Sequence, residues 1–349
     1  MSPRVTLGGP LFNRADHLPQ ALESLLAQTF ADFVLVAVDD ASTDATAEVL
    51  ARFEARDPRL SFVSNPRRLG MTANWRRAYA LALARAPEAE YFAWVSDHDV
   101  WHPRWLEALV SELDAHPEAV VAYPLAVGID GEGHVVRSAP AFDTASLERP
   151  ATRLRAAAWG MHAGDMVYGL FRTAPVRRAG VFRSVLWPDR LLLAELTHEG
   201  RFRQVPELLW WRRFAAPADA ARQRVTLFAG RAPLVARLPW PIAHVAVLLR
   251  AAARGEEPGR GPRARFAARY LAVSAGAEVL RTVLRARNRA GAWLAGRPGA
   301  ATLLGAVEAA ARAAGRPVKL RPAPPADDLR AMAAPRTGAP PGGGTGRTP

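Results

Sequence analysis

The residue types best suited to chemistry lie in one short acidic stretch, Asp97-His98-Asp99. A largely apolar run, YFAWVS, leads directly into it, and Trp101 follows two residues later. Two carboxylates this close repel each other unless a positive charge lies between them. The stretch therefore indicates a site that a bound group completes. The alternative is a polar turn before the helix expected over residues 103–113.

Polar residues also follow three earlier apolar runs, namely Asn13-Arg14, Asp39-Asp40 and the segment 65–68, which ends in Arg68. Each pair alone could be a turn or a capping device. Acidic pairs at the ends of two separate strands are harder to explain as structure, because gathered like charges cost stability unless a ligand compensates them.

The elements that must position these residues alternate in type along the first 125 residues. Apolar, β-rich runs begin at residues 4, 33, 60 and 90, and amphipathic helical runs lie between them. This alternation predicts a doubly wound α/β domain, in which the carboxyl ends of parallel strands open into one crevice. From about residue 126 the pattern becomes α+β, and it includes a helix over WPDRLLLAELTHEG with Asp189 at its start.

The composition is that of a globular protein with 50% hydrophobic residues and no cysteine, which excludes disulfides, thiolate metal sites and a cysteine nucleophile. The net charge of +13 is unevenly placed: residues 231–349 hold 20 Arg and Lys against 6 Asp and Glu, whereas residues 1–230 hold 26 and 27. Arginine mixed with apolar residues in helical stretches suits an anionic lipid surface. Arginine-rich solvated helix faces are the equally weighted alternative.

We expect residues 216–315 to form a mostly helical region that contacts a membrane through residues 231–315. The Pro/Gly-rich residues 316–349 are expected to be a disordered tail. The N-terminus lacks the pattern of a secretory signal, so we expect a cytoplasmic protein, peripheral on the inner face of the membrane.

Residues 4–215 resemble the family 2 glycosyltransferases, whose GT-A fold is a doubly wound, Rossmann-like nucleotide-binding domain with a mixed central sheet. The resemblance rests on ordered segments rather than on one motif, since a lone D-x-D is weak. These segments are LFNRADHLPQALESLLAQTF, VDDASTDAT, DPRLSFVSNPRRLGMTANW, YFAWVSDHDVWHPRWLEALVSEL and WPDRLLLAEL. It implies a domain over residues 1–215, with a nucleotide-sugar half at 1–125 and an acceptor half at 126–215.

The resemblance implies an inverting transfer from a nucleoside-diphosphate sugar, UDP- or GDP-linked, to a glycan or lipid-linked acceptor. Departure of the diphosphate develops negative charge that Mn²⁺ or Mg²⁺ can neutralise, and one or two carboxylates plus phosphate oxygens suit such an ion. We therefore assign Asp99 to the metal and Asp97 to the ribose or donor sugar, with His98 as a spacer or a further ligand. An aspartate replaces His98 in some family members, which leaves the choice of metal ligand open.

The resemblance also assigns roles to the other clusters. Asp40 would accept a hydrogen bond from the nucleobase, Asp39 would support its loop, and Asn13, Arg14 and Arg68 would shape the nucleotide pocket.

The same resemblance makes Asp189 the base that takes the proton of the acceptor hydroxyl, although it could also cap its helix. Glu195 is the alternative base. Trp187 beside Asp189 could stack on a sugar, and Arg212 and Arg213 could approach the diphosphate or stack at a surface.

Three other functions compete with this interpretation. A sugar nucleotidyltransferase would share the crevice, but LGGPLFNR lacks the extended Gly-rich loop of those enzymes. A non-catalytic nucleotide- or glycan-binding protein would keep the fold without turnover. A nucleic-acid binder would use the basic C-terminal third, and we do not expect one.

Overall fold

The computed structural model describes residues 2–130, 134–138, 141–161, 163–213, 220–256 and 261–277. The chain begins with the alternation that the sequence predicts: β1 (Val5–Leu11), α1 (Leu18–Leu26), β2 (Phe33–Asp39), α2 (Thr46–Glu54), β3 (Leu60–Ser64), α3 (Met71–Arg85), β4 (Tyr91–Trp94), β5 (Val100–Trp101) and α4 (Trp105–Ala115).

The elements after α4 mix strands and helices before the chain becomes helical. They are β6 (Ala119–Ile129), β7 (Val135–Ser138), α5 (Pro150–Gly160), α6 (Ala163–Met166), β8 (Leu170–Arg172), α7 (Thr173–Ala179), α8 (Pro188–Glu199), β9 (Arg201–Arg213), α9 (Ala220–Phe228), the 3₁₀ helix η1 (Leu234–Arg237) and α10 (Trp240–Ala253). Residues 261–277 form a further helix.

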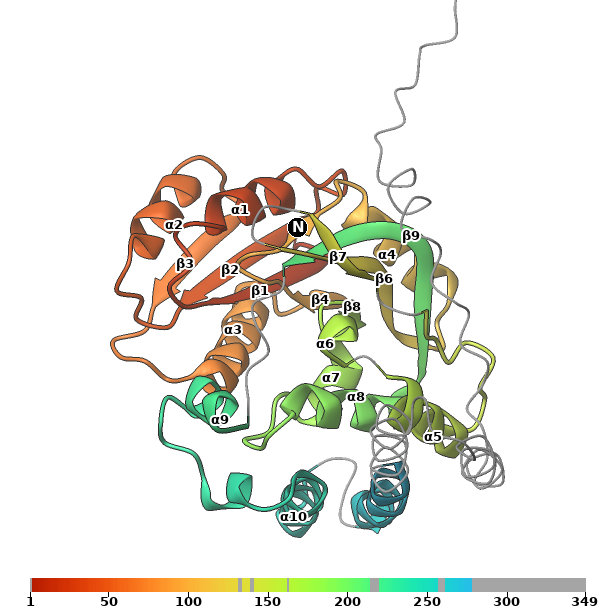
Figure 1. Ribbon diagram of the computed structural model, residues 1–349. Coiled ribbons are helices and arrows are strands. Elements are labelled where there is room, and N and C mark those ends of the chain that lie inside the picture. The colour runs from red at the N-terminus through yellow and green to blue at the C-terminus, as the bar shows by residue number, and fades with distance from the viewer. Residues whose placement is uncertain are drawn as a thin grey trace, which may run out of the picture.

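Nine strands of the described chain form one mixed sheet in the order β3-β2-β1-β4-β8-β6-β9-β5, with β7 paired to β6 (Figure 1). Strands β1 to β4 run parallel to their neighbours within this group, and β8 is antiparallel to β4 and β6. The expected α/β class with a mixed central sheet is confirmed. Parallel strands place their carboxyl ends at one edge of the sheet, so β1, β2 and β4 deliver the residues that follow them to the same place.

Helices cover both faces of the sheet, which explains why its strands are continuous apolar runs. In β2, Leu35 and Ala37 pack on one face with side chains of α1, α2 and α4. Val36 and Val38 point to the opposite face, where they pack with side chains of α3, α7 and α8. The period of two along the strand thus divides the core into two layers.

The short strand β5 is the main departure from the expected order of elements. The sequence predicts a helix directly after the acidic stretch, but Val100 and Trp101 first pair antiparallel with Trp211 and Trp210 of β9. A two-residue strand leaves no periodic signal, and its partner lies about 110 residues further along the chain. This pairing lays the end of β9 against the acidic stretch.

The helices after residue 220 pack on the domain. Ala243 and Leu248 of α10 and Ala267 and Tyr270 of the last helix share a buried cluster with Leu154 of α5 and with residues of α8. The described part of the region expected at 216–315 is therefore helical and seated on α5 and α8, whereas the tail expected at 316–349 lies outside the described residues. Within the described residues, none of the helices has the length and apolar character needed to span a bilayer.

Candidate active site

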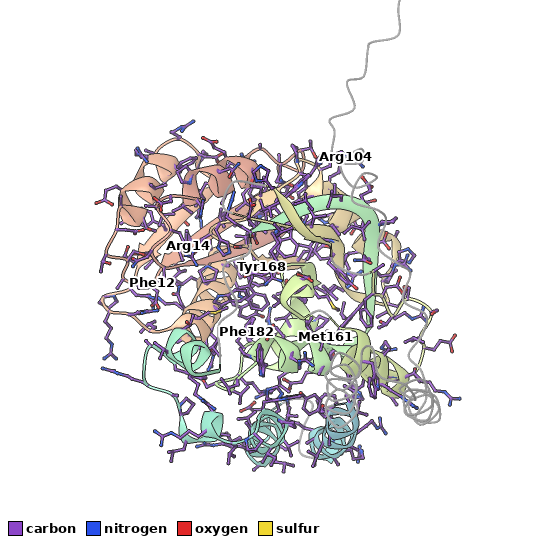
Figure 2. The ribbon with its side chains drawn as sticks, viewed as in Figure 1. Phe12, Arg14, Arg104, Met161, Tyr168 and Phe182 are labelled. Carbon is purple, nitrogen blue, oxygen red and sulfur yellow. The ribbon has the colours of Figure 1, made fainter. Side chains whose placement is uncertain are left out.

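The carboxyl ends of β1, β2 and β4 surround a cleft with a volume of about 150 Å³. The residues after β1 contribute Phe12 and Arg14, and the residues after β4 contribute Ser96 and Asp97. Phe12, Arg14 and Tyr168 are labelled among these side chains in Figure 2. The strand-end clusters singled out in the sequence thus converge, as the parallel arrangement requires.

Asp40 lies at this edge and is nearly inaccessible, with 2% of its surface exposed. Its carboxylate accepts hydrogen bonds from the amides of Leu69 at 2.7 Å and Gly70 at 2.8 Å and from Asn65 Nδ2 at 2.9 Å. It therefore holds the loop that leads into α3. A carboxylate has about four acceptor positions, so Asp40 keeps one for a ligand in the cleft that it lines.

Asp39 and Asn13 join the loops after β1 and β2. Asp39 accepts hydrogen bonds from the amide of Ser42 at 3.1 Å and from its hydroxyl at 2.5 Å. Asn13 has a left-handed backbone with φ of 52°, and its side-chain oxygen accepts from the amide of Thr43 at 2.8 Å. Asp39 and Asn13 therefore hold the loops beside the cleft and do not themselves line it.

Arg68 contributes a flat cationic wall. Its guanidinium carbon lies 3.8 Å from the centre of the Phe12 ring, a cation–π contact, and both residues line the cleft. Arg14 lies nearby, with Nε 3.3 Å from Asp97 Oδ1. Two guanidinium groups and the carboxylates of Asp40 and Asp97 thus line the same cleft.

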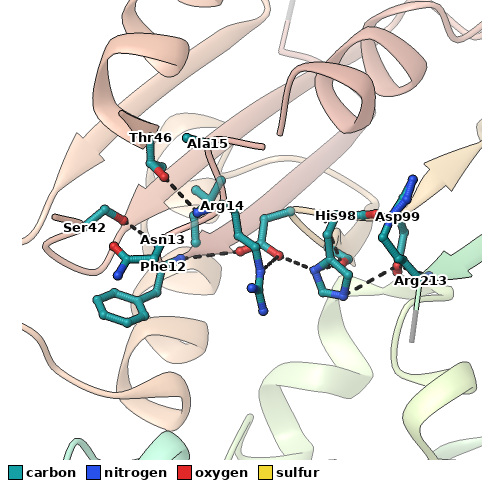
Figure 3. A network of polar contacts seen from close by, with 12 residues as sticks. Phe12, Asn13, Arg14, Ala15, Ser42, Thr46, His98, Asp99 and Arg213 are labelled. Atoms are coloured by element: carbon teal, nitrogen blue, oxygen red, sulfur yellow. Dashed lines mark hydrogen bonds and ion pairs between the residues drawn. The ribbon is translucent and has the colours of Figure 1, made fainter. Parts of the chain in front are cut away.

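The repulsion between the two carboxylates of the acidic stretch is reduced by the imidazole of His98, which contacts both (Figure 3). His98 Nδ1 lies 2.5 Å from Asp97 Oδ1, and His98 Nε2 lies 3.7 Å from Asp99 Oδ1. Burial alone would lower the pKa of His98, but the hydrogen bond and charge of Asp97 and the charge of Asp99 raise it above its ordinary value. The imidazole thus lies between the two carboxylates as a partial counter-charge.

The two aspartates face different surroundings. Asp97 has 11% of its side chain exposed and lines the cleft, whereas Asp99 has 1% exposed. Asp99 accepts hydrogen bonds from the amide of Arg213 at 2.8 Å and from the Trp210 indole at 3.2 Å, both in β9. Burial raises the pKa of Asp99, although His98 and the Arg213 amide oppose that rise. In this arrangement Asp97 is the carboxylate that a ligand in the cleft can reach.

Asp189 is half-buried in the first turn of α8. Burial raises its pKa, against the amides of the helix start and the charges of Arg190 and Arg212. Its charge contributes to the raised pKa of Tyr168, a residue of the cleft, although Asp189 is not itself among the residues that line the cleft. A carboxylate with a raised pKa can act as a general base.

The alternative base, Glu195, has a structural role. It is buried, and its carboxylate pairs with Arg183 at 2.9 Å and Arg263 at 2.7 Å. Both oxygens are engaged in these pairs.

Tyr168, which lines the cleft, and Asp165 near it carried no signal in the sequence. Tyr168 follows α6, and burial raises its pKa, so its hydroxyl stays neutral. Asp165 of α6 pairs with Arg212 at 2.5 Å. This ion pair holds the Arg212 guanidinium near Asp99 of the acidic stretch and near Asp189. These side chains come from elements far apart in sequence, and only the packing of the acceptor half brings them together.

Helix α9 closes one side of the cleft through Thr226. Its C-terminal end approaches Gly70, whose φ is 87°, and a Cβ there would lie 2.6 Å from the amide nitrogen of Ala229. The side chains of Leu227 and Phe228 are buried in a cluster with Leu186 and Ala236. Glycine at position 70 is thus required both by its backbone and by the contact with the C-terminal region.

The comparisons with known proteins agree with this fold. Residues 9–178, just under half of the chain, match the family model described as Glycosyl transferase family 2. The crystal structure of S. aureus TarS 1-349 in complex with UDP-GlcNAc has the same fold, with a TM-score of 0.52 and 16% identity over 77% of this chain and 71% of that chain. The GT-A fold and the resemblance seen in the sequence are confirmed.

Curated relatives match only part of the chain. Protein CgeD of Bacillus subtilis is 32% identical over 35% of this chain and 29% of its own length. An uncharacterised glycosyltransferase of Nostoc sp. is 29% identical over 40% of this chain and 39% of its own length. The chain thus spans about a third of the length of the curated relatives it matches.

We predict that Gly70→Ala destabilises the protein more than a matched glycine substitution does. Gly230 also has a positive φ, 78°, but a Cβ there would meet nothing within 4 Å. Gly230→Ala should cost about 1 kcal/mol through its backbone, whereas Gly70→Ala should add roughly 1–3 kcal/mol for the contact with α9. Urea unfolding measures both, and equal losses would show that α9 does not press on Gly70.

Proposed function

We propose that the protein is a glycosyltransferase that moves a sugar from a nucleoside-diphosphate sugar, UDP- or GDP-linked, to a glycan or lipid-linked acceptor with inversion at the anomeric carbon. The observation that carries the proposal is the cleft itself. It joins the strand-end residues Asp40, Arg68 and Asp97 to an acceptor half in which Asp189 has a raised pKa. TarS, which shares the fold, was crystallised with a nucleotide sugar.

The donor would lie along the strand ends. Asp40 offers its remaining acceptor position to an N–H of the base, and Arg14 and Arg68 provide the positive charge that a diphosphate needs. Tyr168 and Thr226 close the cleft on the acceptor side. The residues of both halves would thus hold the donor with its sugar toward Asp189.

Asp189 would act as the general base. As the acceptor oxygen forms its bond to the anomeric carbon, the bond from that carbon to the diphosphate oxygen breaks on the opposite face, and Asp189 takes the hydroxyl proton. Trp187, exposed to 40% beside Asp189, offers a ring face on which an acceptor sugar can stack.

We propose that a divalent cation, Mn²⁺ or Mg²⁺, binds at the acidic stretch and neutralises charge on the diphosphate. The described residues contain no group of three His, Cys, Asp or Glu side chains that could hold such an ion. One carboxylate with phosphate oxygens and waters is sufficient for Mg²⁺. The sequence assigned the metal to Asp99, but Asp97 lines the cleft with 11% of its side chain exposed, whereas Asp99 is 1% exposed, and this difference favours Asp97 as the ligand.

The membrane contact expected for residues 231–315 gains support from exposed apolar side chains. Leu234 of η1 is 77% exposed, and Ile242 and Leu249 of α10 are 51% and 47% exposed. Residues 231–255 contain four arginines and no Asp or Glu. We propose that this face binds an anionic lipid surface, which would bring the active site to a lipid-linked acceptor.

We predict that Asp189→Asn lowers turnover by about 10²- to 10⁴-fold and leaves nucleotide affinity within about 2-fold, because the amide cannot accept the proton. Release of UDP from UDP-GlcNAc and of GDP from GDP-mannose, with water or added glycans as acceptor, measures turnover. Calorimetry with UDP and GDP measures affinity. Glu88→Gln, an exposed carboxylate after α3, is the control. Unchanged turnover in Asp189→Asn would exclude this residue as the base, and a wild type that binds nucleotide without any turnover would favour a binding protein.

We predict that one of UDP, GDP, CDP and dTDP raises the melting temperature only together with Mn²⁺. Ligand at about 100 times its Kd stabilises by about 2.7 kcal/mol. Asp97→Asn should abolish the metal-dependent part of the shift. Asp99→Asn should lower the stability of the free protein, because it alters a buried acceptor of two hydrogen bonds. If Asp99→Asn abolished the metal effect while Asp97→Asn preserved it, the metal would belong to Asp99.

We predict that Ile242→Gln/Leu249→Gln weakens sedimentation with phosphatidylglycerol vesicles at low salt by about 10-fold or more. The two glutamines remove apolar surface worth roughly 1.5–3 kcal/mol for each side chain. Val63→Gln, on the exposed part of β3, is the control and should bind like the wild type. If neither Ile242→Gln/Leu249→Gln nor Val63→Gln changed the amount of protein that sediments with the vesicles, another face would contact the lipid.

A further inference from the structure

The turn that carries Asp189 has an unusual backbone. Trp187 is the residue before α8 and has φ of 55° and ψ of 50°, a left-handed conformation that a large side chain rarely adopts. Such a conformation is strained and persists only where the surroundings fix it. The orientation of this turn sets the direction of the Asp189 carboxylate two residues later.

The contacts that fix the turn come from the region after β9. His244 of α10 lies with Nε2 2.6 Å from the carbonyl oxygen of Leu186, the residue before Trp187. The Leu186 side chain packs with Leu227 and Phe228 of α9 and with Ala236 of η1. After the base, the Arg190 guanidinium carbon lies 5.5 Å from the centre of the Trp240 ring.

The protonation of His244 follows from its partners. A carbonyl oxygen can only accept, so Nε2 carries the proton and donates it to Leu186. Nδ1 then accepts from the hydroxyl of Tyr270, which lies 2.6 Å away in the last described helix. His244 is fully buried, and burial lowers its pKa to about 4, so the ring stays neutral and keeps this tautomer at pH 7.

We propose that His244 is a positioning residue for glycosyl transfer: through the Leu186 carbonyl it fixes the Trp187 turn and thereby the place of Asp189. This inference rests on the proposed function, in which Asp189 is the base. It extends the active site to elements that lie beyond the family 2 segment 9–178. A misplacement of a catalytic group by about 1 Å can cost on the order of 10²-fold in rate.

Two substitutions at position 244 distinguish the effect of losing the hydrogen bond to the Leu186 carbonyl from the effect of losing the imidazole ring. The amide nitrogen of His244→Gln can reach the place of Nε2 and donate to Leu186, whereas the shorter side chain of His244→Asn reaches only the place of Nδ1, near Tyr270. Both remove the same ring from the core. Arg263→Gln is the matched control in the same region, because it breaks the buried pair with Glu195 and leaves the turn untouched.

The expected result is a selective loss of turnover. UDP release from UDP-GlcNAc and GDP release from GDP-mannose should fall about 10-fold or more in His244→Asn, and within about 3-fold in His244→Gln, with nucleotide Kd unchanged in both. Hydrogen exchange should speed up in His244→Asn alone for the amide of Leu191, which donates to the Trp187 carbonyl at 3.3 Å. Arg263→Gln should lower the melting temperature with normal turnover and normal exchange at Leu191.

Some results would overturn the inference. One is a His244→Asn variant that loses stability as Arg263→Gln does but keeps the turnover and the exchange protection of the turn. A second is a parallel loss of nucleotide affinity, which would mean general disruption. The exchange measurement decides even where neither sugar nucleotide turns over. Full turnover in Asp189→Asn would instead refute the proposed base, whatever His244 does.

Discussion

The burial of Asp99 is the constraint on which the rest of the site depends. A carboxylate removed from water loses several kcal/mol of solvation unless charges and hydrogen-bond donors replace the water. Two of its donors, the Trp210 indole and the Arg213 amide, belong to β9. The end of β9 must therefore lie against the acidic stretch, and β5 pairs with it there.

The same placement of β9 also fixes a contact with helix α6. Arg212, between the two residues that serve Asp99, pairs with Asp165 of α6, next to the turn that carries Tyr168. One long strand thus connects the acidic stretch after β4 to α6, through Arg213 and Trp210 on Asp99 and through Arg212 on Asp165.

The sequence predicts the elements of residues 1–125 well because the hydrophobic patterns of these strands and helices are local. Apolar runs with a period of two and helices with a period of 3.6 give the order from β1 to β4, and the strand-end rule places Arg14, Asp40 and Arg68 at one cleft. Local patterns could not predict that Asp97 faces the cleft while Asp99 is buried. This difference depends on which carboxylate β9 covers, and that strand lies about 110 residues away.

The arginines of the C-terminal region show a second limit of composition. Counting charges treats them alike, yet Arg263 is buried and paired with Glu195, whereas Arg250 and Arg254 are exposed on and beside α10. Only packing separates the arginines that hold the region on the domain from those available to a surface.

The pairing of β6 with β9 has a consequence for how this domain can be divided. These strands run parallel over most of the 11 residues of β6, but the family 2 segment ends at residue 178, before β9 begins. A chain cut there would leave a long, apolar strand edge without its partner, and such edges recruit other chains into aggregates. The segment matched by the family model and the unit that folds cooperatively therefore differ here, and we expect a chain cut at residue 178 to aggregate more readily than one that extends through β9.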